Sequence, residues 1–355
     1  MPITSQLLFQ KDEKVTKIYA TRPLEIDRQK LRETLAELAR RGRVTNRDER
    51  LLECLRELNV LSLDQIWRLF WPRAKEITAY NRLYFLMKHH LLSGARVPAT
   101  EMREWGLPVR KVYALGPGGW LWLKEEVSRT LATRHLRREQ VLHDLLVAEL
   151  YVRLAEAVQQ RGAAWGITWA GEQAASFYGN GDTPLISPDG LAIIRQQRGE
   201  KVAALPFFIE FDKGREAHGR PSSDWGRKVH GYNRFYGGNW KMHPQLHDAP
   251  TFPWVVVITH GAQRLLNLAQ AIRKHRQAPV RYYLALWADL LAAADVLGAP
   301  AWLILAQEDQ VIGLKQDKRQ PLLPGNGEVN GEPAADQKPD LAQPEPDRVG
   351  TESQA

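Results

Sequence analysis

The sequence predicts an α/β protein, in the α+β sense of a helical region and a sheet region, with two folded parts. Apolar residues at helical spacing and one short strand fill residues 46–123, whereas strand-length apolar runs alternate with amphipathic helices over residues 139–314. A length of 355 residues agrees with two domains, and 44% hydrophobic residues with 12 Trp suffice for packed cores. We therefore expect a helical N-terminal unit followed by a mixed-sheet domain with flanking helices.

The charge of the chain indicates a polyanionic partner. The net charge is +8, but residues 315–355 contain five basic and eight acidic residues, so residues 1–314 carry +11. A basic body is typical of nucleic-acid-binding proteins, with general surface charge as the alternative explanation. The one cysteine, Cys54, excludes an intramolecular disulfide framework. With no signal peptide and no apolar run of about 18 residues, we expect a cytoplasmic protein without a membrane span.

The first folded unit is expected at residues 46–123, after an arm and a basic helix over residues 1–45. Its predicted elements are three helices and a strand: Asn46–Leu58, Leu63–Phe70, Glu76–His90 and Lys111–Leu115. Ser62 is the expected N-cap of the second helix. Helix, short helix, turn, helix and β-hairpin is the order of a winged helix-turn-helix, in which the helix after the turn enters the major groove.

The early residues of that third helix are candidates for contacts with base edges, and nearby basic residues are candidates for contacts with phosphates. The hairpin would form a wing from about Arg96 to Lys111. The candidate DNA-binding residues are Lys75, Thr78, Asn81, Arg82, Arg96, Arg103, Arg110 and Lys111. A winged helix also serves as a protein–protein module, and the alternative is an adaptor that recruits replication or mobilisation proteins.

The second folded part is expected at residues 139–314, after a basic linker over residues 124–138. It opens with a long helix over Glu139–Arg161. Three strands, a helix at Asp224–Tyr236 and a strand at Trp254–Thr259 follow, which gives the order α-β-β-β-α-β. Residues 315–355 are rich in Pro, Gly, Asp and Glu without periodicity, and we expect them to be disordered.

The strand Leu205–Asp212 ends in two acids that share a face. Successive side chains of a strand point to opposite faces, so Phe208, Glu210 and Asp212 lie together while the other face enters a core. Asp189 lies 21 residues before Glu210, in a Pro-Asp-Gly sequence, and a neighbouring strand would bring it close. Three carboxylates suit Mg²⁺. The alternative is a turn Asp beside a solvated strand face, paired with Lys213, Arg215 or Lys228.

This order, with Pro188-Asp189 at the second strand and Glu210-x-Asp212 on the third, resembles the PD-(D/E)XK nuclease superfamily. Combined with an N-terminal winged helix, it is similar to the replication-relaxation proteins of bacterial plasmids and integrative elements. The closer resemblance rests on His143-Asp144, Ser187–Gly190, Phe208–Gly214, Trp225-x-x-Lys228, Tyr232, Pro253–Thr259 and Arg264. It implies double-stranded DNA as the partner, a role in plasmid replication or maintenance, and an effect on DNA topology.

One departure concerns the lysine of the nuclease signature, whose position two places after the strand acid is taken by Asp212. Lys228 on the following helix is the candidate replacement, and it shares a helix face with Tyr232. The resemblance implies Mg²⁺-dependent DNA nicking, with Asp189, Glu210 and Asp212 on the metal and Lys228 stabilising charge at phosphorus. The expected supporting residues are Glu149, which would complete the shell, His143 and Tyr232. Without a lysine in the site, the domain would be a degenerate fold that binds DNA, in a catalytically inactive replication or transcription regulator.

Overall fold

The computed structural model describes residues 27–97, 99–107, 111–125, 138–179, 181–214, 224–238, 240–305 and 320–323. Most of the predicted arm, linker and tail lie outside these residues, as do Arg110 and Arg215. Within them, helices and a mixed β-sheet confirm the predicted α/β class. No helix in this described part of the chain has the length and apolarity needed to cross a membrane.

The N-terminal unit contains the predicted helices and hairpin in the predicted order. Its elements are α1 (Arg28–Arg40), α2 (Asn46–Leu58), β1 (Leu61–Ser62), α3 (Leu63–Phe70), α4 (Glu76–Lys88), β2 (Leu92–Arg96), α5 (Ala99–Glu104), β3 (Lys111–Leu115) and α6 (Pro117–Trp122). The strands form an antiparallel sheet in the order β1-β3-β2. Ser62 caps α3 as predicted, in a capping box with Gln65. Helix α1 lies in the region predicted to hold a basic helix, and its Leu31, Leu35 and Leu38 are buried in the core of this unit, with α6 as a neighbour.

The segment between β2 and β3 differs from the predicted wing. It forms the short helix α5, and Val97, Met102 and Leu107 around that helix are buried in the core of the second domain. The backbone carbonyl of Trp105 accepts a hydrogen bond of 2.8 Å from the indole of Trp287. Burial of these apolar side chains against the sheet domain is favourable, and it holds the segment there although the segment also contains arginine. The described part of this segment therefore connects the N-terminal unit to the sheet domain through direct packing.

The C-terminal domain is a mixed sheet with helices on both faces. Its elements are α8 (Arg138–Gln160), β4 (Trp165–Gly171), α9 (Glu172–Ala175), β5 (Phe177–Tyr178), β6 (Pro184–Ile186), β7 (Gly190–Arg198), β8 (Lys201–Asp212), α10 (Asp224–Gly237), the 3₁₀ turn η1 (Trp240–Met242), β9 (Trp254–Thr259), α11 (Ala262–His275), β10 (Tyr282–Leu286), α12 (Trp287–Ala292) and β11 (Trp302–Leu305). Within the described residues the sheet order is β11-β10-β9-β8-β7-β4. β8, β9 and β10 run parallel and the other pairings are antiparallel. Apart from the insertion of α9, β5 and β6, α8 to β9 follow the predicted order α-β-β-β-α-β.

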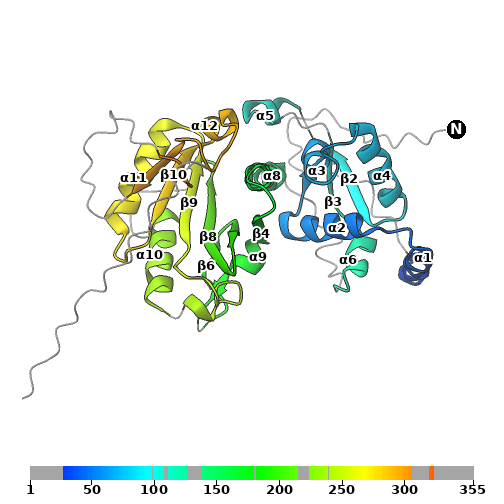
Figure 1. The fold of residues 1–355 in the computed structure, drawn as a ribbon, viewed down its shortest axis with the longest axis horizontal. Helices are drawn as coiled ribbons and strands as arrows, with labels where there is room; N and C mark the ends of the chain where they lie inside the picture. Colours follow the sequence, from blue (N-terminus) through cyan, green and yellow to red (C-terminus); the bar gives the residue numbers. More distant parts are fainter. Residues whose placement is uncertain are drawn as a thin grey trace, which may run out of the picture.

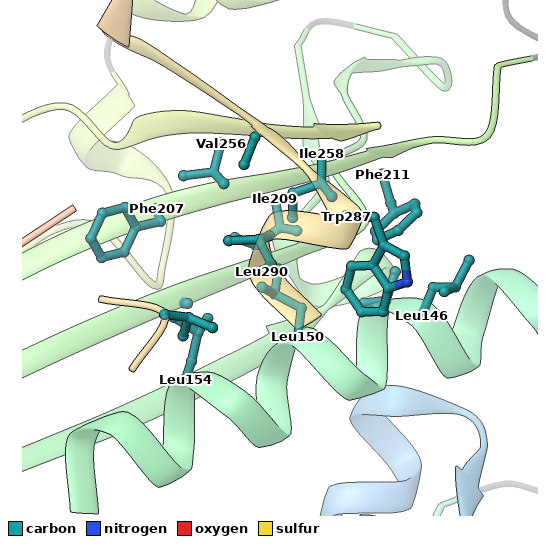
Figure 2. Packing of buried hydrophobic residues seen from close by; sticks show 14 of the residues in the cluster. Leu146, Leu150, Leu154, Phe207, Ile209, Phe211, Val256, Ile258, Trp287 and Leu290 are labelled. Carbon is teal, nitrogen blue, oxygen red and sulfur yellow. The ribbon is translucent and has the colours of Figure 1, made fainter. Parts of the chain in front are cut away.

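Strand β8 separates two cores, as its alternation predicts. Phe207, Ile209 and Phe211 pack with leucines of α8 and with Trp287 and Leu290 of α12 on one face (Figure 2). Phe208 packs on the other face with Trp225 and Tyr232 of α10. Because both faces are covered, the polar side chains at the end of β8 are taken out of water along with the apolar ones.

The two parts of the chain share an extensive joint. Helix α8 lies between the sheet and the N-terminal unit, with α3 against its outer side (Figure 1). The backbone N–H of Gly171 at the end of β4 donates to the carboxylate of Glu57 in α2, at 2.8 Å. A Cβ at Gly171 would overlap the backbone carbonyl of Glu57, so only glycine allows this approach.

Four residues of the predicted disordered tail pack on the sheet domain. Gln320 forms an isolated antiparallel bridge with Trp302 of β11. Leu322 and Leu323 are buried in the core beside α8, and the N–H of Leu323 donates to the carbonyl of Leu297. These residues, which the sequence predicted to be disordered, therefore contribute to the sheet domain.

Candidate functional site

The end of strand β8 places two carboxylates in the interior. Glu210 is 1% exposed and Asp212 is fully buried, and both point to the side covered by α10 and α11. The predicted common face is confirmed. It is buried and not solvated as the predicted alternative had it, although the pairing with Lys228 that this alternative named is present at Glu210. A buried carboxylate is unfavourable unless it is hydrogen-bonded or paired with a cation. The partners of each acid therefore define what this region can do.

Glu210 is held by two side chains of α10. The ammonium of Lys228 donates to Oε2 and the hydroxyl of Tyr232 donates to Oε1, each at 2.7 Å. The two donors are four residues apart and share a helix face as predicted. Burial raises the pKa of Glu210 to about 7, against the lowering effect of Lys228 and with a further raise from the charge of Asp189. Burial thus favours the protonated form of Glu210, while Lys228 and Tyr232 favour the charged form.

Asp189 lies directly before β7, where it is tied to β8 and to α8. Its N–H donates to the carbonyl of Ile209 at 2.9 Å, and its Oδ2 accepts from the N–H of Phe211 at 2.6 Å. Its Oδ1 lies 2.9 Å from Nε2 of His143. Burial on its own would raise the pKa of Asp189, but His143, Lys228 and the Phe211 N–H together hold it below the ordinary value. The fold thus gathers Asp189, Glu210, Lys228 and His143 into one cluster.

His143 completes an ion pair with Asp189. Burial opposes its protonated form, but the charge and hydrogen bond of Asp189 outweigh burial and raise the pKa of His143. Its Nδ1 is buried and has no hydrogen-bond partner within the described residues. The predicted supporting role of His143 therefore corresponds to a direct contact with Asp189.

Asp212 has its own cation, which the sequence argument did not assign to it. The guanidinium of Arg264 donates from Nε to Oδ2 at 2.8 Å and from Nη2 to Oδ1 at 2.7 Å. Thr259 and Trp225 donate to the same carboxylate. Burial would raise the pKa of Asp212, but the Arg264 hydrogen bonds and charge lower it. Topology could have predicted this partner. Strand β9 runs parallel to β8, so α11, which follows β9, begins beside the end of β8 where Asp212 lies.

These partners decide how well the cluster fits a metal ion. Within the described residues, no group of three or more His, Cys, Asp or Glu side chains is arranged to hold one. Arg264 occupies both oxygens of Asp212, while Lys228 and Tyr232 occupy those of Glu210. In this arrangement the donors do not fit a Mg²⁺ centre of three carboxylates. They form three ion pairs: His143–Asp189, Lys228–Glu210 and Arg264–Asp212.

Glu149 is in a different place from the one predicted for it. Its carboxylate accepts from Gln65 and Arg68 of α3 and from Arg153 of α8, at 3.2, 2.8 and 3.0 Å. Arg68 also pairs with Glu156, about two turns further along α8. The acid that interrupts the apolar side of the long helix is therefore part of the joint between the two units, not of the cluster around Glu210.

Most of the predicted DNA-binding residues that the structure describes are exposed, whereas Arg82 is paired within the protein. Lys75, Thr78 and Asn81 are exposed on α4, and Arg96 and Arg103 are exposed around α5, whereas Arg110 lies outside the described residues. Lys111 lies beside α4, where its ammonium is 4.5 Å from the ring centroid of Tyr80.

Arg82 does not face solvent as a base-reading residue would. Its guanidinium pairs with the buried Asp48 of α2, with Nε 2.9 Å from Oδ1, and it donates to the carbonyl of Arg43 at 2.6 Å. It also lies over the ring of Phe85. Two exposed residues of α4 that sequence reasoning missed are Ile77 and Tyr84, with 57% and 60% of their surface exposed.

Comparison with known proteins identifies the family of the chain. No curated protein and no solved structure gives a significant match. The profile of the replication-relaxation family matches residues 52–246, from α2 through the cluster on β7, β8 and α10 to the segment after η1. This match covers more than half of the sequence, with most of the N-terminal unit and the ion pairs His143–Asp189 and Lys228–Glu210, whereas Arg264 lies beyond it. The chain belongs to the replication-relaxation family.

Proposed function

We propose that this protein binds double-stranded DNA during plasmid or mobile-element replication or relaxation, and that its C-terminal domain binds without cutting. Membership of the replication-relaxation family supports the biological setting. The observation that carries the biochemical proposal is the ion-paired state of all three carboxylates in the cluster.

The element order of the N-terminal unit and the charge of residues 1–314 support DNA binding. Its helices and hairpin follow the order of a winged helix-turn-helix, with α4 as the helix after the turn. Residues 1–314 carry +11, which favours a polyanionic partner. Helix α4 lies on the outer side of the unit, with α3 between it and α8 (Figure 1). A duplex at this face would not have to displace the sheet domain.

The C-terminal domain supports a binding role because its acids already have protein cations. A metal-dependent nuclease needs carboxylate oxygens directed at the ion. Here Arg264 is bidentate to Asp212, and bidentate arginine–carboxylate pairs are among the strongest hydrogen-bonded pairs in proteins. The PD-(D/E)XK-like element order would then be retained as a scaffold, since a fold does not fix an activity.

Mg²⁺-dependent nicking is the second candidate, and one observation favours it. Asp189, Glu210 and Lys228 converge, and the pKa of Asp189 is lowered while that of Glu210 is raised to about 7. Pairs of acids with opposed pKa shifts are characteristic of catalytic sites. In that reading Asp189 and Glu210 would hold the ion, which would supply Lewis-acid chemistry at a phosphate.

A plasmid assay separates the two candidates. Wild-type protein is incubated with supercoiled plasmid and Mg²⁺ or Mn²⁺, beside Asp189→Ala, Glu210→Ala and the control Glu200→Ala, which removes an exposed acid at the β7–β8 turn. Our proposal expects plasmid binding by wild type, with affinity falling steeply as salt rises, and no nicked product. Metal-dependent nicking by wild type and Glu200→Ala, lost in the other two variants, would overturn it in favour of the nuclease. Absence of any plasmid binding would overturn both candidates.

A further inference from the structure

We propose that α4 reads A·T base pairs in the major groove, an inference that rests on the proposed DNA binding and names its sequence class. The face concerned is the stripe Ile77, Asn81, Tyr84 and Lys88. At 3.6 residues per turn these positions lie within about 60° of arc, opposite the buried Ala79, Leu83 and Leu86. All four are exposed. The stripe is therefore the part of α4 that a ligand on the outer side of the unit would meet.

The charges around this stripe complement a duplex. Lys111 lies against Tyr80 on one side of α4, and Arg43 lies over Phe85 on the other, 6.0 Å from the ring centroid. Lys75 precedes the first turn, and Lys88 ends the stripe. A helix in the major groove has a phosphate strand on each side, and cations flanking both sides of α4 match that arrangement. The one acid of α4, Glu76, occupies the first turn, where the helix dipole favours a negative charge.

The centre of the stripe, Ile77, Asn81 and Tyr84, has neither arginine nor lysine, and this decides which bases it suits. Guanine is read most often by a bidentate arginine or lysine at its O6 and N7. The only arginine of α4, Arg82, donates to Asp48 and to the carbonyl of Arg43, and so it is committed within the protein. The centre of the stripe therefore presents an amide and apolar groups instead of a guanidinium.

Those groups match adenine and thymine. The amide of Asn81 can donate to N7 and accept from N6 of one adenine, the pairing typical of asparagine in the major groove. Ile77, one turn earlier on the same stripe, offers an apolar surface that suits the C5-methyl group of thymine. Guanine shares the N7 acceptor but has an O6 acceptor in place of the N6 donor, and a G·C pair has no thymine methyl, so the full set of contacts is available in A·T pairs alone. Helix α4 thus combines a general affinity for phosphates with a preference for A·T.

Selection from a random duplex pool with the full-length protein, followed by binding measurements on the selected duplex, tests this inference. We expect the selected sites to contain A·T pairs, and replacement of them by G·C pairs to lower affinity about tenfold or more. Replacing thymine by uracil should weaken wild type but not Ile77→Ala. Replacing adenine by 7-deazaadenine should weaken wild type but not Asn81→Ala. The matched control on the same helix is Lys88→Ala, which should weaken binding to every duplex alike.

Each other outcome counts against the inference. Equal binding of A·T and G·C duplexes, or a G·C preference, would overturn it while leaving the proposed DNA binding intact. Uniform weakening by Asn81→Ala across all sequences would make α4 a backbone-binding helix. Unchanged DNA binding in Ile77→Ala, Asn81→Ala and Tyr84→Ala would remove the stripe from the interface and leave it as a surface for a protein partner. Failure to bind any duplex would overturn the proposed function itself.

Discussion

The ammonium of Lys228 lies 2.7 Å from the carboxylate of Glu210, in an interior where Glu210 is almost completely buried. The lysine comes from the helix that follows β8, one turn before Tyr232, which binds the second oxygen. Even with this cation the pKa of Glu210 is raised, because burial outweighs the attraction. The acid therefore contributes to stability in a pH-dependent manner.

The stability of the Glu210→Gln variant, measured as its unfolding free energy, should increase relative to that of wild type as the pH rises. The pKa of Glu210 is raised from 4.5 to about 7 on folding, so the protonated form stabilises the fold below pH 4.5 and this contribution is lost as the pH approaches about 7. Glutamine does not titrate. The difference in unfolding free energy between the two proteins should therefore shift toward the variant between these pH values and level off above them. Denaturant titrations across this range measure it; a pH-independent difference would contradict a raised pKa.

Arg264→Met should destabilise the protein by about 3 kcal/mol, because it leaves the fully buried Asp212 without its cation. Thr259 and Trp225 would remain as its hydrogen-bond donors. Adding Asp212→Asn removes the unpaired charge and should restore part of the loss. The measurement is a double-mutant cycle by chemical denaturation. Additive effects of the two substitutions would show that the pair is not coupled.

Arg82→Ala should mainly lower the stability of the fold, with little direct effect on which DNA sequence is bound, because Arg82 pairs with the buried Asp48. It leaves the buried Asp48 with Thr45 as its remaining partner, and we expect a loss of about 2–4 kcal/mol in unfolding free energy. Lys75→Ala, at an exposed position, is the control and should change stability by no more than about 0.5 kcal/mol. Thermal unfolding followed by circular dichroism compares them. A fully stable Arg82→Ala protein with altered sequence preference would instead make Arg82 a base-reading residue.

Gly171→Ala should weaken the joint between the two units. A methyl group at this position would overlap the backbone carbonyl of Glu57, and backbone cannot move aside as a flexible side chain can. We expect a loss of about 1–3 kcal/mol and faster proteolysis between the units. Gly166→Ala lies on the same strand, where a Cβ meets nothing within 4 Å, and should be tolerated. Equal behaviour of the two variants would mean that the joint is loose in solution.

Much of the fold was accessible from the sequence because its signals are local. The alternation along β8 assigned Phe207, Ile209 and Phe211 to one face and Glu210 and Asp212 to the other, and the structure has both sets there. The spacing of Lys228 and Tyr232 likewise placed them on one helix face, from which both reach Glu210. The periods of strands and helices are fixed by backbone geometry, so they can be read without knowledge of the packing.

The sequence alone thus specified the order of elements, the faces of each and the segment that holds the acids. The pairing of charged groups followed from the folded arrangement: Arg82 with Asp48, Arg264 with Asp212, and Glu149 with Arg68 between the two units and not in the cluster around Glu210. In the folded protein, the segment predicted to be a wing packs on the second domain through Trp105 and its neighbours. These partners are far apart in sequence, and a buried charge takes whichever opposite charge the packing brings within reach. That choice depends on how helices and sheet assemble, which no local period encodes.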